Sequence, residues 1–343
     1  MNMYDSEKNI SRKLGVSAAV CTFNSARFLP MELETIAGQT VLPDEVVVCD
    51  DGSQDETLEI LENWKRSVPF EVKIFQNTVN LGYTKNFERA VSLCTQDVIL
   101  LADHDDLWRQ DRVEVIREHF TQDPALGLVS SDAELIDAEG REQGMRLREF
   151  VERMHLHDFW RFFFPEDVKM ELWTGCTMAI RRSFLPRILP IPEGIACHDV
   201  WFYLTLALIS ELRFISEPLI SYRLHGQNHS TAPTVEYLRR NPSRWRYFNA
   251  FLETLDTQHP TLIGALEEFA GRELHDLAAK EGGHSMRLER FLNTLKRHKR
   301  HFEARRASVS HPGLLLRELF NGGYLRHPEP FLSFLFDLRN ALR

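Results

Sequence analysis

Three aspartates lie close together directly after an apolar stretch of the chain. Asp103, Asp105 and Asp106 follow the run 97–102, and His104 separates the first two. Carboxylates this close repel one another, so the cluster costs stability unless a cation neutralises it. Mg²⁺ and Mn²⁺ prefer oxygen ligands, and Mg²⁺ often shares its coordination with substrate phosphates. The cluster therefore indicates either a metal site for a diphosphate or a solvated turn, in which Asp106 would complement the N-terminus of the next helix.

Two further polar clusters contain residue types that suit a nucleotide. At the end of an apolar run, Asp50 or Asp51 could accept a hydrogen bond from a pyrimidine N3–H or a ribose hydroxyl. In the segment 80–86, Gly82 permits a turn into a helix N-terminus, which can host an anion, and Lys85 would add positive charge. Asp, Gly and Ser are also common in ordinary strand-to-helix turns, so each cluster alone has that simpler interpretation.

The elements that must position these clusters appear as apolar runs alternating with segments of helical spacing. Strands are expected at 16–23, 45–50, 71–75, 97–102 and 126–130, and helices at 25–39, 83–94, 109–120 and from residue 55 onward. This alternation predicts a largely parallel sheet with crossover connections. Ligands of such sheets lie beyond the carboxyl ends of the strands. Polar clusters fall at those ends, which predicts one shared site; they are 22–24, 50–53 and 103–106.

After about residue 140 the alternation weakens. The expected elements there are a strand at 173–180, a helix at 198–210, a short strand at 213–215 and a polar loop at 222–228. Beyond residue 234 the pattern is mainly helical, with prolines as breakers. The expected organisation is a polar tail at 1–14, an α/β domain at 15–232 and a helical extension at 233–343.

The composition excludes some classes of protein. Hydrophobic residues make up 43% of the 343 residues and charged residues 27%, which allows a sizeable globular core. The net charge of −9 argues against a general nucleic-acid binder. Five cysteines without a CxxC spacing indicate neither a disulfide scaffold nor a zinc ribbon. Buried thiols in a reducing cytoplasm are the simplest interpretation.

The two ends of the chain bear on where the protein works. Residues 1–13 lack the apolar core of a signal peptide, and no apolar run approaches the roughly 18–20 residues of a membrane span. We therefore expect a cytoplasmic protein, attached at most to the inner face of the membrane. Segment 280–343 has an excess of seven positive charges, with a basic stretch at 291–301 and an aromatic one at 331–336. These stretches could bind anionic lipids, cap the α/β domain or form a homodimer surface.

Taken together, the motifs resemble glycosyltransferase family 2. The matching segments follow the family's order, and they are 22–24, 48–55, 80–82, 86–87, 103–108, 175–178, 198–201 and 217–228. The pattern is most similar to the bacterial rhamnosyltransferase-type branch, which builds surface polysaccharides. The resemblance implies the GT-A fold, a Rossmann-like and mostly parallel central sheet flanked by helices, here with a C-terminal helical extension.

The resemblance also implies roles for individual positions. The donor would be a nucleotide-diphosphate sugar, and Mg²⁺ or Mn²⁺ would be the cofactor. The metal ligands would be Asp103, Asp105 and His225. The donor-binding residues would be Thr22, Asn24, Asp50, Asp51, Gly82, Lys85, Asn86, Asp103 and His104. Lone histidines are usually structural, so His225 is singled out only by its place in the matched motif.

The acceptor side departs from the family pattern at one position. Family members typically have an acidic pair where this chain has His198 and Asp199, which leaves Asp199 as the expected catalytic base. An aspartate there could also be a helix N-cap. The acceptor, a saccharide or lipid-linked saccharide, would contact Trp173, Cys176, Thr177, His198 and Trp201. Tryptophans are, however, more often core residues than sugar contacts.

The implied reaction is an inverting transfer. Asp199 would take a proton from an acceptor hydroxyl, which attacks the anomeric carbon from the face opposite the diphosphate. The metal would stabilise charge on the leaving diphosphate, helped by Lys85 or Arg223. Two alternatives remain open here. One is a Mg²⁺-dependent nucleotidyltransferase, although the first strand lacks a Gly-rich phosphate loop; the other is a non-catalytic nucleotide-sugar- or carbohydrate-binding protein, for which His198 is the hint.

Overall fold

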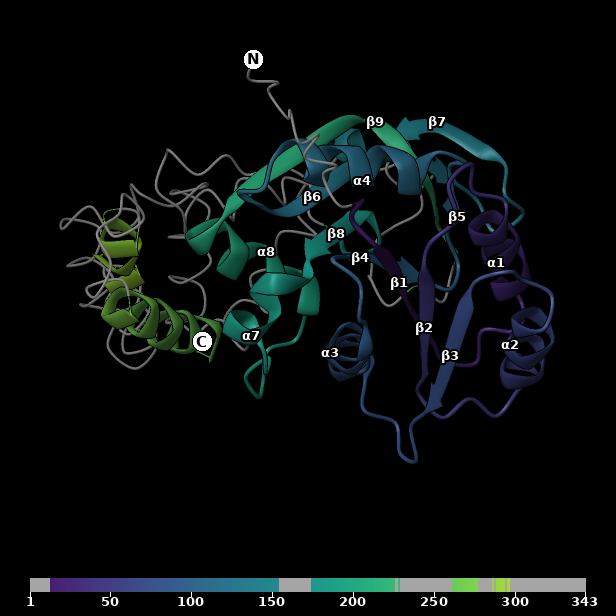
Figure 1. Cartoon of the computed structure of the whole chain (residues 1–343), viewed down its shortest axis with the longest axis horizontal. Helices are drawn as coiled ribbons and strands as arrows, with labels where there is room; N and C mark the ends of the chain where they lie inside the picture. Colours follow the sequence, from purple (N-terminus) through teal and green to yellow (C-terminus); the bar gives the residue numbers. More distant parts are fainter. Residues whose placement is uncertain are drawn as a thin grey trace, which may run out of the picture.

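Strands and helices alternate around one sheet in the first half of the chain (Figure 1). The computed structural model describes residues 13–153, 174–225, 228, 261–276, 286, 288–293 and 295–296. The strands are β1 Val16–Thr22, β2 Glu45–Asp50, β3 Glu71–Gln76, β4 Val98–Asp103, β5 Leu107–Trp108, β6 Leu126–Ile136, β7 Glu142–Arg146, β8 Met178–Arg181 and β9 Glu211–Arg223. The helices are α1 Leu29–Ala37, α2 Thr57–Lys65, α3 Tyr83–Leu93, α4 Arg112–Gln122, α5 Leu147–Arg153, α7 Leu185–Ile188 and α8 His198–Ile209, with 3₁₀ turns η1 Gly175–Thr177 and η2 Arg182–Phe184.

The sheet is parallel in its N-terminal half and mixed beyond it. Its strand order is β3-β2-β1-β4-β8-β6-β9-β5, and β7 pairs with β6. The pairs β3–β2, β2–β1, β1–β4 and β6–β9 are parallel. β8 is antiparallel to both β4 and β6, so it joins the two halves. The expected α/β fold with a mostly parallel central sheet flanked by helices is confirmed.

Helices cover both faces of the parallel strands, which is why the inner strands β1, β2 and β4 are buried and mostly apolar, while the edge strand β3 is mixed. Successive side chains of β1 point to opposite faces. Val20 belongs to the core formed with α1, α2 and α4, which includes Leu33 and Ile116. Ala19 belongs to the core formed with α3, α7 and α8, which includes Phe87. The carboxyl ends of the strands are left for polar residues.

Two strands are longer than their sequence pattern predicts. The strand expected at 126–130 continues to Ile136, and the one expected at 213–215 is part of the 13-residue β9. Ser131 and Asp132 interrupt the apolar pattern of β6, yet both are buried, because pairing with β9 satisfies the backbone there. Helices α1 and α4 start later than expected, α1 with proline in its first turn, where a missing N–H costs nothing.

A C-terminal helix packs on the α/β domain. Residues 261–276 are helical, and Phe269 contacts the Trp201 ring edge-to-face at 5.9 Å between centroids. Nε of Arg187 donates to Glu273 at 3.0 Å across the same contact. This part of the predicted extension therefore shares a core with α7 and α8, while the boundary at 232/233 stays a prediction. No helix in the described ranges is both long and apolar enough to span a bilayer.

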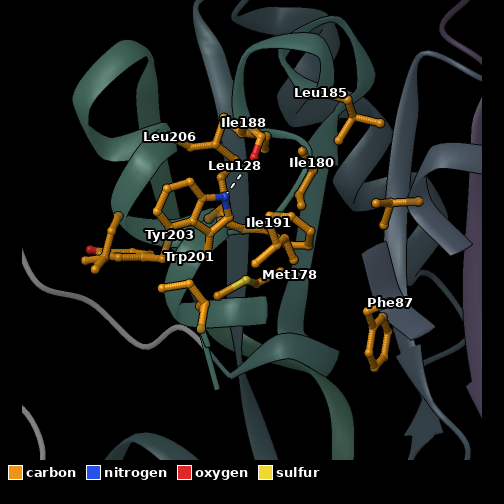
Figure 2. Packing of buried hydrophobic residues seen from close by; sticks show 14 of the residues in the cluster. Phe87, Leu128, Met178, Ile180, Leu185, Ile188, Ile191, Trp201, Tyr203 and Leu206 are labelled. Carbon is orange, nitrogen blue, oxygen red and sulfur yellow. Dashed lines mark hydrogen bonds between the residues drawn. The ribbon is translucent and has the colours of Figure 1, made fainter. Parts of the chain in front are cut away.

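Trp201 should be one of the residues on which stability depends most. Its side chain is 2% exposed, and its Nε1 donates to Ile188 O at 2.7 Å inside the cluster of Figure 2. We expect Trp201→Ala to lower the free energy of unfolding by about 3–5 kcal/mol, because it leaves a cavity and an unpaired carbonyl. Urea denaturation measures this loss. Met286→Ala, at a side chain 62% exposed, should change stability by less than about 0.5 kcal/mol; similar effects in both variants would contradict the core assignment.

Candidate active site

The acidic turn and the end of β9 meet at the edge of the sheet. β5, directly after the turn, pairs antiparallel with β9, so Leu107 lies opposite Ser221. The chain leaving β9 returns to the acidic turn, and Nε2 of His225 lies 2.7 Å from Oδ2 of Asp105. The His225 ring stacks on Phe28, with centroids 4.7 Å apart. Two of the three predicted metal ligands are therefore in contact although they are 120 positions apart.

The segment that carries His225 is held by hydrogen bonds at both ends. Nε of Arg223 donates to Asp105 O at 2.7 Å. The Asn228 amide donates to Arg223 O at 2.9 Å, and its Oδ1 accepts the His225 N–H. Asn228, which received no role of its own from sequence reasoning, thus closes the turn that presents the imidazole. The sequence signal that could have identified Asn228 is its place in the matched motif, three residues after His225.

Asp106 is not the N-terminal charge of the next helix. α4 begins at Arg112 and its N-cap is Asp111, so that alternative interpretation is wrong. Asp106 is buried, and its Oδ1 accepts the backbone N–H of Arg223 at 2.9 Å. Burial, with the nearby carboxylates, raises the pKa of Asp106 well above its usual range. Its position ties β9 to the acidic turn.

The carboxylates of Asp103 and Asp105 have opposite pKa shifts. Burial, followed by the charges of Asp105 and Asp199, raises the pKa of Asp103 to about 8. Burial also acts to raise the pKa of Asp105, but the His225 hydrogen bond and the charges of His104 and His225 outweigh it, and the pKa is lowered. Asp105 is therefore ionised at neutral pH, as a ligand of a hard cation must be.

Two overlapping sets of side chains have the chemistry to hold a divalent ion. In the predicted set, Asp105 and His225 lie 2.7 Å apart, close to the roughly 3 Å between neighbouring ligands of an octahedral ion with bonds of about 2.1 Å. Asp103, Asp106 and Cys176 also offer ligand atoms within 4.8 Å of one another. Burial raises the pKa of the Cys176 thiol well above its usual range, and only a thiolate binds metal well. The Asp105–His225 pair therefore fits Mg²⁺ or Mn²⁺ better.

A buried guanidinium that sequence reasoning missed lies beneath the acidic turn. Nη2 of Arg112 donates to Leu101 O at 3.2 Å and to Cys176 O at 2.6 Å, and the guanidinium lies over the Trp108 ring at 4.2 Å. It thereby links β4 to the turn η1. Glu32 on α1 is buried beside this group. Helical periodicity was the sequence signal that could have predicted its burial. Arg112 lies on the same face of the helix as the core residue Ile116, four positions later.

Asp199 lies in the first turn of α8, close enough for its charge to act on Asp103 of the acidic turn. Its Oδ1 accepts the Val200 N–H at 2.8 Å, and its Oδ2 accepts the Gly175 N–H at 3.3 Å. The N-cap of α8 is Cys197, so the simple N-cap interpretation of Asp199 is wrong. Burial raises the pKa of Asp199 to about 6. A carboxylate with that pKa is both ionised and basic near neutral pH, as a general base should be.

Most of the predicted donor-binding residues are hydrogen-bonded within the protein. Asp50 accepts the Thr22 hydroxyl at 2.9 Å, and Asp51 accepts the Gly82 N–H at 2.9 Å. The Asn86 amide donates to a backbone carbonyl of β2 at 2.8 Å. These bonds hold the loops after β1, β2 and β3 against one another. The structure thus brings these residues together, while their contacts with a donor stay a prediction.

The other predicted donor-binding residues lie nearer to solvent. Asn24 has a φ of 49°, and its Oδ1 accepts the Gln54 N–H at 2.9 Å. His104 is half-buried beside the acidic turn. Nζ of Lys85 forms an ion pair with Glu88 at 2.7 Å, so its charge is already compensated.

Comparison with known proteins agrees with this geometry. Residues 17–186 match the model of the family described as glycosyl transferase family 2. The chain belongs to this family. Membership decides against the alternative of a nucleotidyltransferase, and the expectation of a family 2 glycosyltransferase is confirmed.

Individual relatives of this glycosyltransferase match parts of it. An uncharacterized glycosyltransferase from Nostoc sp. is 27% identical over 231 residues, which are 64% of this chain and 68% of the relative. Chondroitin synthase from Escherichia coli is 34% identical over 63% of this chain but only 30% of its own length. The solved structure of S. aureus TarS 1–349 with UDP is 15% identical, with a TM-score of 0.55, over 95% of this chain and 91% of that chain. The last likeness supports the GT-A fold.

The predicted acceptor residues of the glycosyltransferase are largely buried. Cys176 and Thr177 lie inside η1, and Trp201 is in the core, with no face open to a sugar. His198 stacks on the Phe87 ring at 4.0 Å, and burial lowers its pKa to about 3. Trp173 lies outside the described residues. The structure therefore brings Asp199, but not Trp201, to the acidic turn.

Proposed function

We propose that this chain is an inverting, metal-dependent enzyme that transfers a sugar from a nucleotide-diphosphate sugar, of the UDP-sugar or dTDP-rhamnose type, to a saccharide or lipid-linked acceptor in surface-polysaccharide synthesis. The names of similar proteins support these classes. One E. coli relative, 28% identical over 39% of this chain and 48% of its own length, is named for UDP-Gal and a diphosphoundecaprenol acceptor. TarS has been solved with UDP-GlcNAc, at a TM-score of 0.51.

The contact between Asp105 and His225 is the observation that carries the proposal. The Asp105 carboxylate and the His225 imidazole, which Asn228 holds in place, lie 2.7 Å apart and would supply two of the about six ligands of an octahedral ion at the edge where this fold binds ligands. Asp103 at the end of β4 would supply a further oxygen once the bound cation displaces its proton, because burial raises its pKa to about 8. When bound, Mg²⁺ or Mn²⁺ would supply positive charge to the leaving diphosphate.

The side chain of Asp199 performs the proton transfer in this proposal. Its carboxylate accepts the proton of the acceptor hydroxyl, and the Gly175 and Val200 N–H groups hold it in one orientation. The acceptor oxygen attacks the anomeric carbon opposite the diphosphate, so the configuration inverts without a covalent enzyme intermediate. General-base catalysis of this kind typically contributes about 10²- to 10⁴-fold to the rate.

Release of UDP or dTDP from a panel of nucleotide sugars tests the function. We expect release from at least one sugar in the presence of Mn²⁺, and about 100-fold less with EDTA, because the metal supplies several kcal/mol of charge stabilisation. Nucleotide binding without release would favour the non-catalytic alternative. Release that is indifferent to EDTA would contradict the metal requirement, and the active sugars would identify the donor.

Contact with the inner membrane remains part of the proposal. The basic stretch 291–301 lies mostly, and the aromatic stretch 331–336 entirely, outside the described residues. Phe291 and Leu295 of the basic stretch are buried, so part of it packs inward. Lipid binding and a homodimer both stay predictions, as does the similarity to the rhamnosyltransferase-type branch.

A further inference from the structure

The leaving diphosphate needs a cation that neither expected residue supplies. Lys85 is paired with Glu88, and its Nζ also donates to Ile191 O at 2.5 Å. Arg223 is buried and donates to the backbone carbonyls of Asp105, Asp137 and Ala138. The Lys85 ammonium is thus engaged by the fold, and so are Nε and Nη1 of Arg223; Nη2 of Arg223 has no partner among the described residues but is buried away from solvent. The acidic turn, by contrast, adds negative charge beside the expected position of the diphosphate.

Arg27 has the required chemistry and position. It is exposed, and its guanidinium carbon lies 4.7 Å from the centroid of the Phe28 ring. The same ring stacks on His225 at 4.7 Å, so a single aromatic side chain links Arg27 to the metal-binding pair. Within the described ranges, no carboxylate forms an ion pair with Arg27. An exposed guanidinium that pairs with none of the described carboxylates, close to a candidate metal site, is suited to an anion.

The backbone around Arg27 is fixed, so its side chain starts from a defined place. The Ser25 N–H donates to Thr57 Oγ1 at 2.7 Å, and the Ala26 N–H donates to Asp55 at 3.0 Å. This loop follows β1, whose Cys21 pairs with Asp103 of β4. Arg27 and the acidic turn therefore lie at the carboxyl ends of neighbouring parallel strands.

We propose that Arg27 binds the diphosphate of the donor and of the nucleoside diphosphate product. This inference rests on the proposed function and adds a residue to it. During transfer the bond from the anomeric carbon to the diphosphate oxygen breaks and its electron pair stays on that oxygen. The bond to the acceptor oxygen forms, and the acceptor proton goes to Asp199. Arg27 donates hydrogen bonds to the diphosphate, where the negative charge develops, and so stabilises the leaving group.

Binding of UDP, dTDP, uridine and thymidine in the presence of Mn²⁺ tests this role by calorimetry. We expect Arg27→Ala to weaken binding of the preferred nucleoside diphosphate about 10- to 100-fold, the usual worth of a hydrogen bond to a charged group. Nucleoside binding should change less than about twofold, and Arg27→Lys should be intermediate because the charge remains without the bidentate fork. Arg66→Ala, at an exposed arginine after α2, is the matched control and should bind as the wild type does.

Each other outcome has a distinct meaning. Equal diphosphate affinity in Arg27→Ala and wild type would overturn the role of Arg27 and leave the proposed function intact. An equal loss for diphosphate and nucleoside would also overturn it, because the loss would then come from the base side or from packing. Failure of the wild type to bind either diphosphate would overturn both this inference and the proposed function.

Discussion

Replacing Asp199 with asparagine should lower kcat by about 10²- to 10⁴-fold and leave donor affinity nearly unchanged. The amide has almost the shape of the carboxylate and can keep the hydrogen bond from the Gly175 N–H, but it cannot accept the proton of the acceptor hydroxyl. Nucleotide release in the presence of acceptor measures kcat, and calorimetry with UDP or dTDP measures affinity. A loss of kcat without a loss of affinity would identify a general base.

The pH profile adds a signature that a structural role would not produce. Burial raises the pKa of Asp199 to about 6, and the base acts only when ionised. The kcat/KM of the wild type should therefore fall as pH drops through about 6, and this acid limb should be absent from the residual activity of Asp199→Asn. Glu193→Gln removes an exposed carboxylate just before α8 and should retain both rate and profile. An unchanged limb in Asp199→Asn would assign the titration to another group.

Asp105→Ala should abolish Mn²⁺-dependent nucleotide binding and turnover. The change removes an ionised oxygen ligand and leaves His225 without its partner at 2.7 Å. The loss of metal affinity should exceed the about 10- to 100-fold that follows loss of an outer-shell partner. Titration with Mn²⁺ followed by electron paramagnetic resonance measures it directly. Undiminished turnover in Asp105→Ala would overturn the metal assignment.

Cys176→Ala separates the two candidate ligand sets. If the metal is held by Asp105 and His225, removing the thiol should change Mn²⁺ affinity by less than about twofold, because the thiol is then no ligand. If Asp103, Asp106 and Cys176 hold the metal instead, Cys176→Ala removes a ligand. Its loss of Mn²⁺ affinity should then be as large as the loss predicted above for Asp105→Ala. The burial of Cys176 makes a stability measurement on the same variant necessary.

The elements of the parallel half of the sheet could be predicted from the sequence. A strand buried on both faces is mostly apolar, so β2 was predicted with its observed bounds and β1 and β4 to within one residue at each end. The short run of the edge strand β3, which alternates apolar and polar residues, was also predicted to within one residue. The ends of β6 and β9 could not be predicted, because pairing between them buries polar residues such as Asp132 that local pattern alone assigns to a loop.

The candidate site likewise has a part that the sequence predicts and a part that only the tertiary structure shows. Sequence by itself determined the acidic turn at the end of β4 and, through the matched motifs, the candidates Asp105, Asp199 and His225. Only the tertiary structure decided which side chains meet. It places Trp201 in the core, pairs Lys85 with Glu88 and leaves Arg27 exposed against the Phe28 ring, on which His225 also stacks. The physical reason is the distance along the chain over which each signal acts. Hydrophobic periodicity indicates burial within one helix or strand, whereas the pairing of β5 with β9 joins residues more than 100 positions apart.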